Sequence, residues 1–230
     1  MTVRQIRRWH LFPDADELTC SLHPLIVDLA SRAIRERGRF DIVLAGGETP
    51  RRLYRSLAGA ETGWKNWCVY FSDERCVPAG DARRNDLMAR AAWLDRVPIP
   101  PERIYSIPAE LGPEEGARRY ADRLSGQGAF DLVLLGLGED GHTAGLFPGG
   151  GKTLDLSDTV AVFDAPKPPP ERVSLSALRL SRAGRVFFML TGRHKQEAVR
   201  RWRADAPIPA NNIAPEGGVD IFLDYRAADW

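Results

Sequence analysis

A carboxylate and an imidazole, separated by a single residue, lie in a glycine-rich segment near the middle of the chain. Asp140 and His142 alternate there with Gly136, Gly138 and Gly141. An imidazole with an ordinary pKa near ~6.5 can take a proton from water at neutral pH, and a carboxylate beside it can orient the ring and stabilise its charged form. Glycine lets backbone N–H groups approach a bound molecule because it has no Cβ. These residue types predict general base catalysis.

A lone histidine in a polar turn usually does no more than cap its neighbours. Here the glycines, Asp140 and His142 share one loop directly after the apolar run 132–135, which is short enough for a strand buried on both faces. In open α/β sheets, ligands bind beyond the carboxyl ends of the strands. The position of the loop therefore favours a catalytic role over a capping role.

A second strand end carries features of a phosphate site. Residues 40–45 are predicted to form a strand, Gly46 and Gly47 follow it, and Thr49 can serve as the N-cap of a helix over residues 49–57. The N-terminus of a helix attracts anions through its free N–H groups and its dipole. Two glycines before a helix are equally typical of a plain tight turn. The spacing matches neither a dinucleotide fingerprint nor a P-loop.

Charged side chains follow a third strand end. Asp73, Glu74 and Arg75 come directly after the predicted strand 67–72. A surface ion pair is the simplest interpretation, but the position predicts that they face the same edge of the sheet as His142. Residues 83–85, with two arginines and an asparagine, lie just downstream and offer a further cation, although basic pairs recur on helices throughout the chain.

Two further cations have no role that spacing alone decides. Arg172 follows the proline-rich segment 166–170, and Lys195 stands at the start of the predicted helix 195–202. Each side chain is suited to bind an anion, and each is equally suited to an exposed position in water.

Strands alternate with helices along the chain. Strands are predicted at residues 9–12, 40–45, 67–72, 103–107, 132–135, 159–163, 185–190 and 219–223, and helices at about 14–37, 49–57, 85–94, 113–124 and 195–202. Pro24 predicts a kink in the first helix or a start later than Asp14. Residues 149–157 are predicted to be a loop, and 172–176 a strand or the entry to a helix. The alternation predicts an α/β fold with a mostly parallel sheet covered on both faces, in one domain over residues 1–230.

Composition narrows the classes of function. Of the 230 residues, 43% are apolar and 27% are charged, and the formal net charge is +1, so no overall field favours nucleic acid or an anionic membrane. The three cysteines follow no metal-ligand or redox spacing and are typical of free thiols in a reducing compartment. The N-terminal residues lack the apolar core of a signal peptide, and no apolar run is long enough to span a membrane. We expect a cytosolic protein.

The motifs together resemble the glucosamine-6-phosphate isomerase/6-phosphogluconolactonase family, and its lactonase branch in particular. The resemblance rests on AGGETP at 45–50, DERCVP at 73–78, GLGEDGHTAGLFPG at 136–149, PKPPPERVSL at 166–175 and TGRHK at 191–195. It covers nearly the whole chain, and it implies a Rossmann-like sheet of the phosphosugar-isomerase type.

The implied reaction is hydrolysis of 6-phospho-D-glucono-1,5-lactone to 6-phosphogluconate in the oxidative pentose phosphate pathway, with no metal and no organic cofactor. His142 is then the general base, and either Asp140 or Asp73 orients it. Backbone amides of the glycine loop, or Arg75, hold the oxyanion. No serine or cysteine stands in a nucleophile elbow, which favours direct attack by water.

By the same resemblance, the substrate phosphate binds at the glycine turn between two cations. The residues involved are Gly46, Gly47, Thr49, Arg172 and Lys195. The chain departs from the family at Gly145, where serine or another small residue is usual, and at Glu48, where serine is frequent. Glu48 places a negative charge beside the expected phosphate. The expected partner is this small lactone, with no nucleic acid and no membrane, and the expected state is a monomer or a weak dimer.

Two other functions remain open alternatives. A deaminase of the same family carries a glutamate shortly after the motif histidine and a tyrosine after the Asp-Glu pair, whereas this chain has Leu146, Phe147 and Pro148 in the first place and Arg75 in the second. A phosphosugar-sensing regulator usually carries a DNA-binding helix-turn-helix, for which there is no room before the first predicted strand. Both comparisons favour the lactonase.

Overall fold

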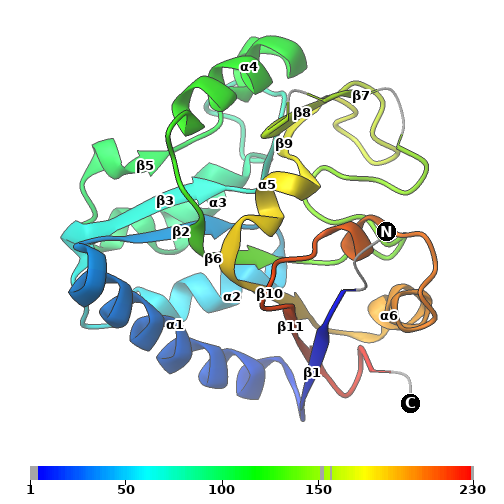
Figure 1. The fold of residues 1–230 in the computed structure, drawn as a ribbon, viewed down its shortest axis with the longest axis horizontal. Coiled ribbons are helices and arrows are strands. Elements are labelled where there is room, and N and C mark those ends of the chain that lie inside the picture. Colours follow the sequence, from blue (N-terminus) through cyan, green and yellow to red (C-terminus); the bar gives the residue numbers. More distant parts are fainter. Residues whose placement is uncertain (1–4, 151–152, 156, 229–230) are drawn as a thin grey trace.

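Seven parallel strands form the central sheet of the computed structural model, which describes residues 5–150, 153–155 and 157–228 (Figure 1). Their order across the sheet is β1-β11-β10-β6-β2-β3-β5. The strands are β1 (Arg7–Phe12), β2 (Phe40–Leu44), β3 (Trp67–Phe71), β5 (Ile104–Tyr105), β6 (Phe130–Leu135), β10 (Ala183–Leu190) and β11 (Val219–Asp224). The predicted mostly parallel sheet is confirmed.

The order of the strands reverses between β2 and β6. From β2 the chain continues outward through β3 to β5, and from β6 it continues in the opposite direction through β10 to β11. Segments that follow β2 and β6 therefore leave the sheet on opposite sides of a crevice at the carboxyl ends of these strands. Such a reversal is where open α/β sheets bind ligands. Both loops singled out in the sequence, after β2 and after β6, begin there.

Helices cover the sheet on both sides. Figure 1 shows α1 and α2 on one side of the sheet and α4 on the other. Every residue of β2 and β3 is buried, as expected for strands covered on both faces. The helices are α1 (Ala15–Arg37), α2 (Glu48–Leu57), α3 (Asn85–Ala92), α4 (Pro113–Leu124), α5 (Ala177–Ser181) and α6 (Gln196–Arg203).

The first helix begins and ends where its capping residues predict. The Asp14 carboxylate accepts N–H groups of the first turn, and Gly38 ends the helix in the left-handed conformation at φ 75°. Pro24 lies inside the helix, so the alternative of a start well beyond Asp14 was wrong. Burial of an apolar face, including Leu18, Leu22 and Ile26, outweighs the loss of one helical hydrogen bond.

A small antiparallel sheet stands beside α4, and the sequence did not predict it. Its order is β4-β9-β8-β7, with strands β4 (Asp73–Arg75), β7 (Thr153–Asp155), β8 (Thr159–Val162) and β9 (Arg172–Leu175). The expected loop over 149–157 was wrong because it contains β7. Of the two interpretations of 172–176, the strand is confirmed as β9, and α5 follows it. Pairing of β4 with β9 brings Asp73 opposite Ser174 and Arg75 opposite Arg172.

No helix among the described ranges combines the length and the apolar character that a lipid bilayer requires for a crossing.

Candidate active site

A cleft of about 430 Å³ lies at the carboxyl ends of the central strands, where the strand order reverses. Segments that follow β2, β3, β6, β10 and β11 line it. All but one of the predicted site residues line this cleft, namely Gly46, Gly47, Thr49, Asp73, Arg75, His142, Arg172 and Lys195. The exception, Asp140, does not line the cleft itself, but it is hydrogen-bonded to His142, which does. The fold thus brings together residues that are far apart in the sequence.

The loop after β6 folds back on itself around two glycines. The N–H of Gly138 donates to the carbonyl of His142 at 2.7 Å, and a Cβ on Gly138 would lie only 2.0 Å from Nδ1 of His142. Gly141 has a φ of 89°, which L-residues with side chains rarely adopt. The glycines are therefore needed to place the imidazole over the backbone of the preceding turn.

Asp140 holds the imidazole of His142 in one orientation. Its Oδ1 lies 2.5 Å from Nδ1 of His142 and also accepts the backbone N–H of His142 at 3.1 Å. Because Nδ1–H donates a hydrogen bond to the carboxylate, the lone pair of the neutral ring lies on Nε2. The sequence left open whether Asp140 or Asp73 orients the ring. Among the described hydrogen bonds of His142, the side-chain partner is Asp140, while Asp73 acts on the ring through its charge.

The pair is tuned so that the imidazole is neutral and the carboxylate charged near pH 7. Burial lowers the pKa of His142 from its ordinary value of 6.5, although the hydrogen bond and charge of Asp140 oppose this shift. For Asp140, burial alone would raise the pKa. The hydrogen bonds and charge of His142 together outweigh burial, and the pKa of Asp140 falls below its usual 3.8. A neutral, oriented imidazole is the form that accepts a proton from water.

Phe147 forms the wall behind His142. Its ring centroid lies 4.8 Å from that of the imidazole, and the guanidinium of Arg172 lies 5.4 Å from the centroid of the same phenyl ring. Phe147 is only 7% exposed. The ring shields one side of the imidazole from water, which contributes to the burial that lowers the pKa of His142.

The three charged residues of β4 do not all face the cleft, because successive side chains of a strand point to opposite faces. Asp73 and Arg75 line the cleft, whereas Glu74 is buried away from it and accepts three backbone N–H groups. The Arg172 guanidinium lies 3.8 Å from the carboxylate of Asp73. Arg75 donates to the carbonyl of Arg83 through one guanidinium nitrogen. The prediction that all three face the cleft was therefore wrong for Glu74.

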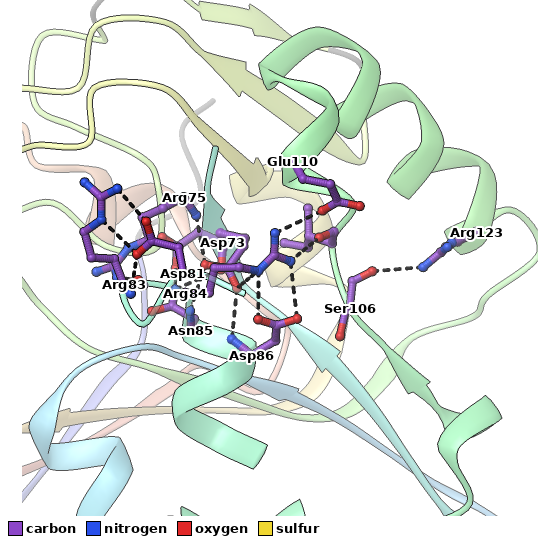
Figure 2. Close-up of polar contacts among 12 residues, drawn as sticks. Asp73, Arg75, Asp81, Arg83, Arg84, Asn85, Asp86, Ser106, Glu110 and Arg123 are labelled. Atoms are coloured by element: carbon purple, nitrogen blue, oxygen red, sulfur yellow. Dashed lines mark hydrogen bonds and ion pairs between the residues drawn. The ribbon is translucent and has the colours of Figure 1, made fainter. Parts of the chain in front are cut away.

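The cation expected from residues 83–85 does not enter the cleft. Figure 2 shows Arg83 paired with Asp81, and Arg84 in a separate cluster with Asp86 and Glu110. Arg84 is 3% exposed and also donates to the carbonyl of Ile107. The residue of this segment that lines the cleft is Asn85. Sequence reasoning missed it because it looked there for charge.

The glycine turn after β2 presents an open helix N-terminus. Gly47, with a φ of 110°, is the N-cap of α2, and no side chain caps this end. The expected N-cap Thr49 was therefore wrong: Thr49 lies inside α2, and its hydroxyl lies 2.7 Å from that of Thr191. The free N–H groups of Glu48 and the residue after it remain available to an anion.

Arg172 and Lys195 are both partly or fully withdrawn from water. Arg172 is 5% exposed and donates to the carbonyls of Lys167 and Pro169, at 3.1 and 3.3 Å. Burial lowers the pKa of Arg172 and of Lys195 from their ordinary values. Cations in such surroundings bind anions more strongly than cations in water.

Further cleft residues were missed by sequence reasoning. Besides Asn85, they include Lys167, Thr191, His194 and Arg226. Lys167 and Thr191 lie within segments that carry the family resemblance, and that was the signal available for them. Arg226, after β11, had none. Within the described ranges, no three histidine, cysteine or carboxylate side chains gather in a way that would hold a metal ion.

Comparison with known proteins identifies the family of the chain. Residues 13–222 match the family model described as glucosamine-6-phosphate isomerases/6-phosphogluconolactonase. The chain belongs to this family. A 6-phosphogluconolactonase of Nostoc sp. is 35% identical over 94% of this chain and 95% of its own length, and that of Homo sapiens is 36% identical over 95% and 91%. The crystal structure of 6-phosphogluconolactonase from Thermotoga maritima superposes with a TM-score of 0.87 at 25% identity, covering 95% of this chain and all of the other.

The two departures from the family pattern have distinct surroundings. The N–H of Gly145 donates to Oγ of Ser174 at 3.0 Å, and a Cβ at Gly145 would lie 2.8 Å from Cβ of Ser174. Glycine fits this close approach without displacement. Glu48 is 58% exposed at the start of α2 and forms an ion pair with Arg51, which offsets part of its charge.

Proposed function

We propose that this protein hydrolyses 6-phospho-D-glucono-1,5-lactone to 6-phospho-D-gluconate in the oxidative pentose phosphate pathway. The observation that carries the proposal is the pair of Asp140 and His142 in the same cleft as the uncapped start of α2, in a member of this family. The 6-phosphogluconolactonases of Nostoc and Homo sapiens, each about one third identical over nearly the whole chain, support it.

His142 acts as the general base. Nε2 of the neutral ring takes a proton from a water molecule, which attacks the lactone carbonyl at carbon 1. Asp140 holds the ring through Nδ1 and stabilises the imidazolium as it forms. The tetrahedral oxyanion is stabilised by N–H groups of the loop after β6 or by Arg75. When the intermediate collapses, the imidazolium returns its proton to the leaving ring oxygen and the lactone opens.

The phosphate binds at the other end of the cleft. The start of α2, at Gly46, Gly47 and Thr49, supplies backbone N–H groups and the positive end of the helix dipole. Lys195, in the turn after β10, and Arg172, in β9, add positive charge. Binding of this remote group orients the ester over His142 and its water.

The environment of His142 does not favour the deaminase alternative. The deaminases of this family carry a glutamate shortly after the motif histidine, and a carboxylate there can transfer a proton when a sugar ring opens. Here Phe147 occupies that stretch and packs against the imidazole with centroids 4.8 Å apart. A phenyl ring cannot transfer a proton, which supports hydrolysis over deamination.

Lactone consumption above the spontaneous rate is the direct test. Purified protein should accelerate hydrolysis of 6-phosphogluconolactone strongly and that of unphosphorylated gluconolactone weakly. It should not release ammonia from glucosamine 6-phosphate. Absence of any acceleration of the phosphorylated lactone, or release of ammonia, would overturn the proposal.

The cellular setting is part of the same proposal. We place the enzyme in the cytosol, because Cys20, Cys68 and Cys76 are all free thiols, which suit a reducing compartment. We propose a monomer or a weak dimer, since few large apolar side chains are exposed among the described residues: Ile6, Leu11, Leu111, Leu178 and Tyr225. Light scattering across a range of protein concentrations tests the oligomeric state.

A further inference from the structure

The asparagine that begins α3 is fixed on three sides by groups outside its own helix. Glu74 in β4 accepts the backbone N–H groups of Asn85 and Asp86, at 2.8 and 2.9 Å, and thereby satisfies the first turn of α3. Asn85 is 3% exposed, yet it lines the cleft. The small accessible surface of Asn85 therefore faces the cleft.

The orientation of the amide group follows from its partners. Nδ2 of Asn85 lies 3.0 Å from the carbonyl oxygen of Asp73 and 3.3 Å from its carboxylate, and both of these atoms only accept hydrogen bonds. The nitrogen must therefore face Asp73, and Oδ1 faces the opposite way. A Cβ on Gly46 would lie 2.0 Å from this Oδ1, so the amide oxygen rests directly on the glycine turn after β2.

Oδ1 of Asn85 is an acceptor held between the two ends of the cleft. Among the hydrogen bonds of the described residues, both that involve the Asn85 side chain use Nδ2, so Oδ1 has both lone pairs available. This oxygen is not one of the fully buried side-chain atoms without a hydrogen-bond partner. Part of its surface is therefore accessible to solvent or to a ligand. An amide oxygen in this position suits a hydroxyl donor.

We propose that Asn85 is a specificity-determining residue whose Oδ1 accepts a hydrogen bond from a secondary hydroxyl of the sugar lactone. The inference rests on the proposed function: with the 6-phosphate at the start of α2 and carbon 1 at His142, the hydroxyls on carbons 2, 3 and 4 lie between the two ends. Asn85 touches the glycine turn on one side and Asp73 on the other. It recognises the hydroxyl pattern that neither the phosphate contacts nor the base can distinguish.

A cycle of enzyme and substrate variants tests this contact. Kinetics of wild type and Asn85→Ala are measured on 6-phosphogluconolactone and on its 2-deoxy, 3-deoxy and 4-deoxy analogues. For the parent, Asn85→Ala should lower kcat/KM by about 10- to 100-fold, the cost of a hydroxyl left without its acceptor. For one of the three deoxy lactones, the same substitution should cost about threefold or less, because that contact is already absent.

Asp86→Asn is the matched control. Asp86 is the neighbour of Asn85 in α3, is buried, and pairs with Arg84 rather than lining the cleft. This variant should lower the Tm and leave the kinetic constants of all four lactones unchanged. If Asn85 only braces the glycine turn, Asn85→Ala will instead cost the same factor on the parent and on all three deoxy lactones, and the proposal is wrong. A wild-type protein that fails to accelerate the parent lactone refutes the proposed function itself, and this inference with it.

Discussion

The proposed catalytic end and the proposed phosphate end of the cleft differ in the groups that form them: side chains at the first, and mainly backbone N–H groups at the second. At the proposed catalytic end, Asp140 is hydrogen-bonded to His142 at 2.5 Å, and the charge of Asp73 also acts on the imidazole. At the proposed phosphate end, the donors are backbone N–H groups at the start of α2, and Lys195 supplies charge from the turn between β10 and α6. One end depends on the identity of single side chains, while the other depends mainly on where the chain turns. Substitutions should therefore act on chemistry at the first end and on substrate selection at the second.

The largest effect is expected at the catalytic end. His142→Ala should lower kcat by about 10²–10⁴-fold while the fold persists, because the loop is shaped by glycines and the base alone is lost. Steady-state kinetics and a circular dichroism spectrum check both parts. His23→Ala removes an imidazole from α1, outside the cleft, and should leave kcat unchanged. A folded His142→Ala enzyme with near wild-type kcat would remove His142 from the mechanism.

At the phosphate end, loss of a cation should appear as a loss of selectivity. Lys195→Ala should lower kcat/KM for the phosphorylated lactone by about 10- to 100-fold, the range for charge-assisted hydrogen bonds. Hydrolysis of unphosphorylated gluconolactone, which never uses this contact, should stay within about twofold. Lys65→Ala, at an exposed position after α2, serves as the control for general charge. Equal damage to both lactones would show that Lys195 acts on the ester or on the fold.

Arg172 is proposed to bind the phosphate, yet it lies close to residues of the catalytic end. Its guanidinium lies 3.8 Å from Asp73 and packs over Phe147, next to the imidazole. As a phosphate clamp, it should behave like Lys195: Arg172→Ala lowers kcat/KM about 10- to 100-fold for the phosphorylated lactone only. The same pair of substrates provides the measurement. A matching loss on the unphosphorylated lactone would assign Arg172 to the catalytic end.

More of the residues at the catalytic end than at the phosphate end could be predicted from the sequence, and the reason is physical. Asp140, His142 and their glycines lie within one loop, so local spacing already expresses their geometry. Thr191, whose hydroxyl lies beside that of Thr49, and Arg226 enter the cleft from segments after β10 and β11, and only the folded sheet brings them there. Contacts between distant segments leave no periodic pattern in a single sequence.

The same reasoning explains which parts of the fold were predicted. The strands of the central sheet form apolar runs that can be recognised individually, and their alternation with helices predicts parallel pairing. In the small sheet, β4 and β7 have only three residues each, too few to show a period of two. The pairing of β4 with β9 is nonetheless what separates Glu74 from its neighbours and places Asp73 beside Arg172. Short strands around a site are where sequence patterns fail.

The pH dependence tests the pairing of His142 with Asp140. The base works only as the neutral ring, so kcat/KM should fall as the pH drops through the pKa of His142, which burial sets below 6.5. Asp140 raises that pKa through its hydrogen bond and its charge. Asp140→Asn should therefore move the acid limb to lower pH, and it should lower the rate at pH 7 about tenfold because the imidazolium loses its charged partner. A limb that stays fixed or moves to higher pH contradicts the pairing.

The smallest expected effect is at Glu48, the charge that departs from the family pattern. Its carboxylate stands at the start of α2, 58% exposed and paired with Arg51, beside the proposed phosphate. A negative charge there stabilises the helix through its dipole, so Glu48→Ser should reduce the Tm slightly. The same charge repels a dianion, so the substitution should lower KM for the phosphorylated lactone about twofold. Screening shortens the reach of exposed charges to about 3 Å at 1 M salt, so the gain should disappear in high salt. Glu61→Ser removes an exposed carboxylate beyond the other end of α2 and should leave KM unchanged. If Glu48→Ser raises KM, the carboxylate assists binding at this end, and the phosphate does not lie beside it.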